Sequence, residues 1–213
     1  YFHKLNPFSP RKTEKQKVVT WRLWIKVLIG SIPAGVIGIL FNDLIEEKFN
    51  NAYVVAAMLI VYGILFIVIE NYQKDREPKV KKISQLTIPM LLIIGVFQML
   101  AMIPGTSRSG ATIVGALLLG VSRAVATEFT FFLAIPAMFG ASAVKLIHFG
   151  LSFTAMQLFL LILGMVVSFA VSIVAIKFLM RYIKKHDFKV FGYYRIVLGI
   201  IVLLYFGVTA LLA

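Results

Sequence analysis

One short loop concentrates the residues that could do chemistry, Pro104-Gly105-Thr106-Ser107-Arg108-Ser109-Gly110. It carries three hydroxyls and one guanidinium, a planar and permanently charged group whose geometry matches phosphate oxygens. Its two glycines let backbone N–H groups come close to a ligand. A helix that we expect to open at Ala111-Thr112 would add free N–H groups and a dipole that favours an anion. The loop therefore predicts a phosphate site.

The surroundings of Arg108 strengthen this interpretation. Gly- and Ser-rich loops are often plain turns, and an arginine can extend to a lipid phosphate. Here, however, Arg108 lies between two apolar runs, where a charge costs about 2.5–3.5 kcal/mol. No acid lies within 15 residues of it along the chain. A bound phosphate is the simplest partner, although the loop is not a Walker A motif, because no Lys follows Gly110.

The composition indicates a membrane protein. Of 213 residues, 60% are hydrophobic and 15% are charged, whereas soluble domains are about half apolar and about a quarter charged. The net charge of +13 sits in short loops between apolar runs, which fits the positive-inside rule better than nucleic-acid binding. The absence of cysteine excludes disulfides and thiolate metal sites.

Apolar runs long enough to cross about 30 Å of hydrocarbon predict several membrane spans. The segment 86–121 is also apolar apart from the phosphate loop. The five simple spans are expected at 25–41, 52–70, 126–147, 155–180 and 191–212.

Charge sets the sidedness of these spans. The basic loops 1–26, 71–85 and 181–189 are assigned to the cytoplasm, and the loops 42–51 and 148–154 to the outside. Both ends of 86–121 must then lie on the cytoplasmic side. Its 18-residue run reaches about 27 Å and its 11-residue return only about 16 Å, so we predict a re-entrant helix–loop–helix hairpin.

Other polar residues have plainer interpretations. Glu128 is interpreted as an acid that extends to the interface or pairs with Arg123, and Glu70 in the same way. Arg195 is expected to meet a lipid headgroup more readily than a substrate. Gln98 is expected to join helices. No two of the three histidines are spaced to share a metal.

The loop and its flanks resemble the bacitracin-resistance type of bacterial undecaprenyl-pyrophosphate phosphatase. The stretch PGTSRSGAT is the most specific part, and the similarity extends over nearly the whole chain. The residues that carry it are 95–113, Gly120-Val121-Ser122-Arg123, 126–136, Ile32-Pro33-Ala34-Gly35-Val36-Ile37-Gly38 and Tyr194-Arg195.

The resemblance implies an all-α polytopic membrane bundle with an inverted repeat. It also implies hydrolysis of undecaprenyl pyrophosphate to undecaprenyl phosphate and inorganic phosphate, which recycles the lipid carrier of peptidoglycan synthesis in the bacterial inner (cell) membrane. The hairpin loop would face the outer side. The catalytic residues would be Arg108, Ser107 and Ser109, and the substrate phosphates would be bound by Gly105, Thr106, Gly110 and Thr112.

One family signature has no match in this chain. It is an earlier Glu-rich segment that supplies two glutamates, a serine and a histidine. We therefore expect residues 1–213 to form a single transmembrane domain that lacks an N-terminal re-entrant hairpin and one span. A divalent cation, Mg²⁺ or Ca²⁺, would be bound by that other segment, and no metal ligand is assigned here.

The expected partners are the lipid substrate and membrane lipids, with no nucleic acid, and a homodimer is left open. The alternative function is a transporter or flippase for a polyprenyl-phosphate or phospholipid-like anion, because transporters also aim the N-termini of broken helices at anionic substrates.

Overall fold

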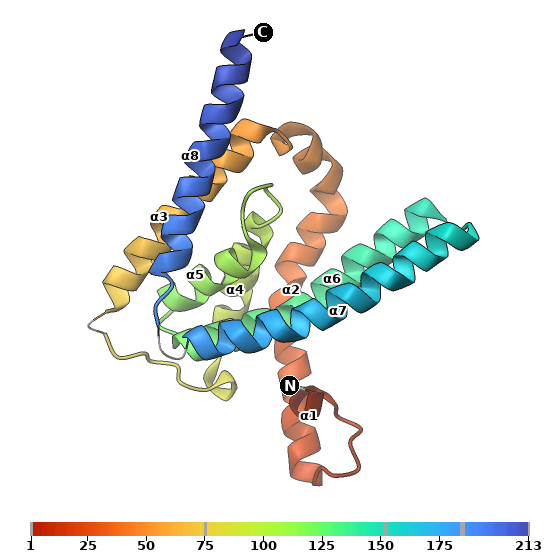
Figure 1. Cartoon of the computed structure of the whole chain (residues 1–213). Helices are drawn as coiled ribbons and strands as arrows, with labels where there is room; N and C mark the ends of the chain where they lie inside the picture. Colours follow the sequence, from red (N-terminus) through yellow and green to blue (C-terminus); the bar gives the residue numbers. More distant parts are fainter. Residues whose placement is uncertain (1, 75, 151–152, 184–185, 213) are drawn as a thin grey trace.

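Eight α-helices and one 3₁₀ turn make up the part of the chain that this computed structural model describes, residues 2–74, 76–150, 153–183 and 186–212 (Figure 1). Within those residues the only β-type pairing is an isolated bridge between Val80 and Val121. The elements are α1 (Phe2–Leu5), α2 (Glu14–Phe49), α3 (Ala52–Gln73), η1 (Ile83–Gln85), α4 (Ile88–Leu100), α5 (Arg108–Leu118), α6 (Arg123–Phe149), α7 (Ala155–Ile183) and α8 (Lys189–Leu212).

Five of these helices are long and apolar enough to cross a membrane. The qualifying stretches are Glu14–Phe41, Ala52–Gln73, Arg123–Phe149, Ala155–Ile183 and Lys189–Leu211. They coincide with the five spans predicted from the sequence. The chain is an all-α polytopic membrane protein, as predicted.

The helices pack as two close pairs joined by the short helix α5. α2 lies along α4, and α3 lies along α8, while α5 contacts α3, α4 and α6. Lipid offers helices no hydrophobic reason to associate, so close backbone approach must hold such pairs. At the α3–α8 crossing a Cβ on Gly63 would lie 2.8 Å from the carbonyl oxygen of Gly192, which leaves room for glycine alone.

The helices α6 and α7 form a long arm that extends away from these pairs (Figure 1). The first half of α6 is buried against α5, with Phe129, Phe132 and Leu133 almost inaccessible. Along α7, Ile183 alone is buried among the described residues. The apolar sides of the arm are therefore open to lipid.

The predicted re-entrant hairpin is confirmed as α4, a loop and α5. The 13 residues of α4 and 11 of α5 give lengths of about 20 Å and about 16 Å, too short to cross a bilayer. Both ends of the hairpin meet, because Lys79 N and Val80 N donate to Gly120 O at 2.9 and 3.2 Å, and Ser122 N donates to Val80 O at 2.9 Å.

Two side chains fasten the hairpin base to neighbouring helices. Lys26 of α2 donates from Nζ to the carbonyl oxygens of Ile83, Ser84 and Leu86 at 3.1, 2.7 and 2.7 Å. Gln73, at the end of α3, donates from Nε2 to Leu117 O. At its other end the hairpin loop points toward the α2–α3 turn (Figure 1).

Three predicted boundaries are wrong. The expected cytoplasmic loop 1–26 is helical from Glu14, because Thr13 caps the start of α2. The expected outer loop 42–51 is helical as far as Phe49, because charged residues end the hydrocarbon span without ending the helix. The expected helix start at Ala111-Thr112 lies instead at Arg108, because Ser107 is a good N-cap.

Candidate active site

The loop between α4 and α5 ends in a capped helix start. Ser107 has extended backbone angles, and its Oγ accepts a hydrogen bond from Gly110 N at 3.2 Å. Ser109 Oγ lies 3.1 Å from Ser107 Oγ. Arg108 and Ser109 therefore occupy the first turn of α5, where the positive end of the helix dipole adds to the guanidinium charge.

The Arg108 side chain is half-buried. Within the described residues no hydrogen bond or ion pair holds its guanidinium. The backbone N–H groups of Arg108 and Ser109 also have no partner there. Three kinds of donor, a cation, hydroxyls and helix N–H groups, are thus concentrated at one helix end, which is the donor set of an anion site.

Thr112 and Gly110 face the protein. The Thr112 hydroxyl is buried, lies 2.9 Å from Thr130 Oγ1, and reaches the carbonyl oxygens of Arg108 and Ser109 at 3.0 and 3.1 Å. A Cβ on Gly110 would lie 3.1 Å from the ring of Phe66. Their packing fixes the start of α5 against α3 and α6, and their predicted contact with phosphate stays a prediction.

Gly105 makes the turn that brings the loop against α3. Its φ of +86° belongs to the left-handed region that glycine tolerates, and a Cβ there would overlap the backbone of Val55. Its carbonyl oxygen accepts a hydrogen bond from Arg195 Nη2 at 2.7 Å. The last helix therefore reaches the loop through Arg195.

Three buried polar atoms at and near the loop have no hydrogen-bond partner among the described residues. They are Thr106 Oγ1, Arg195 Nε and Gln98 Oε1. Buried polar atoms are nearly always satisfied in folded proteins, so each needs an explanation such as a ligand or an ordered water. Tyr62, also buried, lies close enough to Arg195 to interact with its charge.

An acid approaches the loop from α2. A small cavity of about 170 Å³ is lined by Ile45, Glu46, Asn50, Met102 and Pro104. Glu46 is distant in sequence from the loop, so only the fold brings the two together. Glu46 makes no ion pair with Arg108.

The described residues do not fit a divalent cation of their own. Among them no group of three or more His, Cys, Asp or Glu side chains is arranged to hold a metal. Hard cations such as Mg²⁺ and Ca²⁺ need several oxygen ligands, and the hydroxyls of the loop with Arg108 beside them are a poor substitute.

The two membrane-border acids have specific partners, and one prediction for them is wrong. Arg123 pairs with Glu70, donating from Nε to Oε1 and Oε2 at 3.0 and 2.9 Å, and Glu70 Oε1 also accepts from Phe188 N at 3.1 Å. Glu128 pairs with Lys4 at 2.6 Å instead of with Arg123. Glu70 is a stronger partner for Arg123 than Glu128 is, because Glu70 is buried on α3 beside the start of α6.

Sequence reasoning underestimated Arg195. Its expected headgroup contact is replaced by the hydrogen bond to Gly105 O. The available signal was its position in the second turn of an apolar helix, where a charge needs a partner in the protein. Gln98 was expected to join helices through a hydrogen bond. Its buried Oε1 accepts no hydrogen bond from the described residues, so that bond is not seen for this atom.

The chain is similar to known proteins over its whole length. The family model described as "Bacitracin resistance protein BacA" matches residues 1–201. A protein named undecaprenyl-diphosphatase from Desulfitobacterium hafniense is 58% identical over the whole chain, which covers 77% of that protein. Undecaprenyl-diphosphatase 1 of Clostridioides difficile is 62% identical over 97% of the chain and 74% of its own length. The chain therefore belongs to the bacitracin resistance protein BacA family.

Proposed function

We propose that this protein is an undecaprenyl-diphosphatase, which hydrolyses undecaprenyl pyrophosphate to undecaprenyl phosphate and inorganic phosphate. Family membership and relatives that carry this name at 55–62% identity support the proposal. The single observation that carries it is the half-buried Arg108 at the start of α5, which lies between apolar helices and has no hydrogen bond or ion pair to its guanidinium among the described residues.

The reaction transfers the terminal phosphoryl group to water. A water oxygen attacks the terminal phosphorus, the bond from that phosphorus to the bridging oxygen breaks, and the bridging oxygen leaves with undecaprenyl phosphate. Charge is spread over the oxygens of the transferring group during this step. A preorganised cation and N–H donors directed at those oxygens lower the barrier.

Within this scheme Arg108 holds the pyrophosphate and stabilises charge on the transferring group. Ser107 and Ser109 donate hydrogen bonds from their hydroxyls to phosphate oxygens, together with the backbone N–H groups of the first turn. Gly105 and Thr106 shape the loop, and the unsatisfied Thr106 hydroxyl is available to the ligand or an ordered water. Gly110 and Thr112 keep the helix start in place.

The apolar tail of the substrate would lie between helices or in lipid. Placing the basic loops in the cytoplasm directs the hairpin loop toward the outer face of the bacterial inner membrane. A dependence on Mg²⁺ or Ca²⁺ is part of the proposal, with ligands that do not come from a cluster within the described residues. A homodimer stays a prediction.

The test is phosphate release from undecaprenyl pyrophosphate by the full-length protein in detergent. Arg108→Ala should lower kcat/KM at least about 100-fold, the usual cost of removing one transition-state donor. Arg181→Ala is the matched control, because Arg181 is exposed near the end of α7. Equal activity of both variants would remove Arg108 from the mechanism. A folded protein that binds the lipid without releasing phosphate would instead support a carrier.

A further inference from the structure

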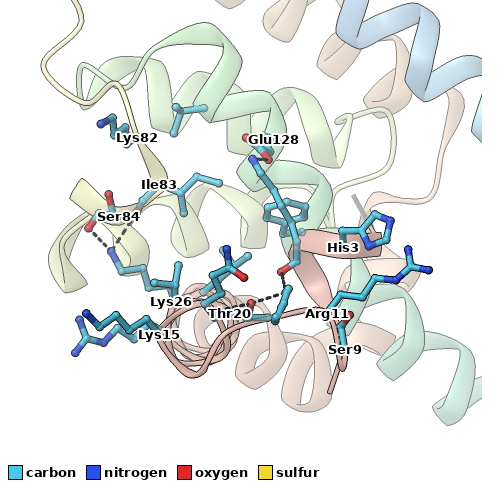
Figure 2. A pocket seen from close by; sticks show the side chains of 18 of the residues that line it. His3, Ser9, Arg11, Lys15, Thr20, Lys26, Lys82, Ile83, Ser84 and Glu128 are labelled. Carbon is cyan, nitrogen blue, oxygen red and sulfur yellow. Dashed lines mark hydrogen bonds and ion pairs between the residues drawn. The ribbon is translucent and has the colours of Figure 1, made fainter. Parts of the chain in front are cut away.

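A region rich in lysine and arginine lies at the base of the hairpin, at the opposite end from the hairpin loop. It is a broad cleft of about 1010 Å³ between the α1–α2 segment, the residues around η1 and the first turns of α6 (Figure 2). Eight Lys and Arg side chains line it against a single acid, Glu128. None of the loop residues 104–112 lines the cleft, so this region is separate from the proposed active site.

Some of these cations already serve the fold. Lys26 binds backbone carbonyl oxygens around η1, Lys4 pairs with Glu128, and Lys12 donates to Thr20 Oγ1 at 2.7 Å. These contacts hold the walls of the cleft together. They also occupy the one acid that lines the cleft, Glu128.

Four cations in the cleft make no side-chain hydrogen bond or ion pair among the described residues. They are Arg11, Lys15, Arg22 and Lys82. Figure 2 shows Arg11 on one side of the cleft and Lys15 and Lys82 on the other. The charge is thus spread along an extended surface, which suits headgroups arranged in a plane better than one compact ion.

The floor of the cleft is apolar. Val125 and Phe132 of α6 are buried there, and Val19 and Leu23 of α2 line it as well. Trp24, one residue on, donates from Nε1 to Leu5 O at 2.8 Å, and tryptophan is typical of the membrane–water interface. Inorganic phosphate has no apolar part that could contact this floor, whereas the glycerol and first methylenes of a lipid could pack against it.

We infer that this cleft binds an anionic phospholipid of the adjoining leaflet. The phosphate would lie among Arg11, Lys15, Arg22 and Lys82, and the upper part of the acyl chains would lie against Val19 and Leu23. Basic side chains at a membrane surface attract anionic headgroups. This inference does not depend on the proposed phosphatase activity.

The experiment uses the full-length protein in phosphatidylcholine nanodiscs with trace spin-labelled lipid. The association of labelled phosphatidylglycerol is compared with that of labelled phosphatidylcholine. The unmodified protein should prefer phosphatidylglycerol several-fold, and Arg11→Gln/Lys15→Gln/Lys82→Gln should bring the ratio close to one. The matched control Lys74→Gln/Arg181→Gln/Lys189→Gln removes the same charge from the same face outside the cleft and should keep most of the preference.

Three other results would contradict the binding of an anionic lipid in this cleft. The inference is overturned if the triple variant keeps its preference, or if the control loses as much, since binding would then follow net charge alone. Displacement of the lipid by millimolar inorganic phosphate would assign the cleft to a soluble anion and also overturn it. Should the triple variant fail to give a monodisperse protein, the single Lys82→Glu variant replaces it and should lower the preference while phosphate release stays unchanged.

Discussion

Arg195 on the last helix donates a hydrogen bond from Nη2 to the carbonyl oxygen of Gly105, across 90 residues of sequence and at 2.7 Å. This bond joins α8 to the loop that precedes Arg108. Because α8 also packs along α3, and Gly105 rests on Val55 of α3, the loop is held from two sides. The position of Arg108 therefore depends on residues that do not touch the phosphate in the proposed scheme.

Replacing Arg195 should slow the reaction without unfolding the protein. A hydrogen bond to a charged donor contributes about 1.5–3 kcal/mol, so Arg195→Gln should lower kcat roughly 10- to 100-fold. Arg195→Lys keeps the charge but not the planar geometry, so its kcat should lie between those of Arg195→Gln and the unmodified enzyme. Steady-state phosphate release on protein that elutes as one peak measures this, with Arg181→Gln as control. An Arg195→Gln enzyme with normal kcat would show that the loop holds its shape without this bond.

Gly105→Ala should destabilise the protein. A side chain at φ +86° costs about 1–2 kcal/mol, and the added Cβ would also overlap the backbone of Val55. Gly140→Ala is the matched control, since a Cβ at Gly140 would meet nothing within 4 Å and alanine favours a helix. Thermal denaturation in detergent should give a lower Tm for the first variant and an unchanged or higher Tm for the second.

Removing Glu70 should be more damaging than removing Glu128. Glu70 is 1% exposed and holds both Arg123 and Phe188 N. Because Glu70→Ala leaves the buried Phe188 N–H without its acceptor, it should cost about 1–3 kcal/mol and lower Tm by roughly 2 °C or more. Glu70→Gln, which keeps an acceptor, should lose less.

The control is Glu128→Ala, whose partner Lys4 is 61% exposed at its side chain. Exposed pairs contribute about 0–1 kcal/mol, so its Tm should change little. If both variants melt together, the Glu70–Arg123 pair does not anchor the start of α6.

Arg108→Lys tests whether charge alone is enough. Lysine keeps the positive charge but cannot present two parallel N–H groups to phosphate oxygens. We expect kcat/KM between those of the unmodified enzyme and Arg108→Ala. A lysine variant as poor as alanine would show that the planar geometry matters more than the charge, and full activity would show the reverse.

The sequence predicts the membrane architecture well because hydropathy and charge act over whole segments. The five spans and the hairpin 86–121 follow from apolar length and the positions of basic loops, and both hold in the structure. The ends of α2 and α5 could not be placed the same way, because helix ends depend on caps such as Thr13 and Ser107. Hydropathy indicates where the hydrocarbon layer ends, and a helix can begin before that point or continue beyond it.

Only part of the candidate site can be predicted from the sequence. The cluster at 104–110 is local, so its residue types predict an anion site directly. Arg195, Tyr62 and Glu46 reach that neighbourhood only through the pairing of distant helices. Nothing in the residues around each of them encodes that approach, and a single sequence therefore leaves them as isolated polar residues.

The short length of α4 and α5 bears on how the protein is made. Neither helix is long enough to be threaded across a bilayer by itself, and the loop between them carries a charge. The pair is therefore expected to enter the membrane as one unit, with Lys26 and Gln73 fastening its base. During biosynthesis the loop between the two helices should reach its final position late, because α6 and α8, which also hold α5 and the loop, are made after them.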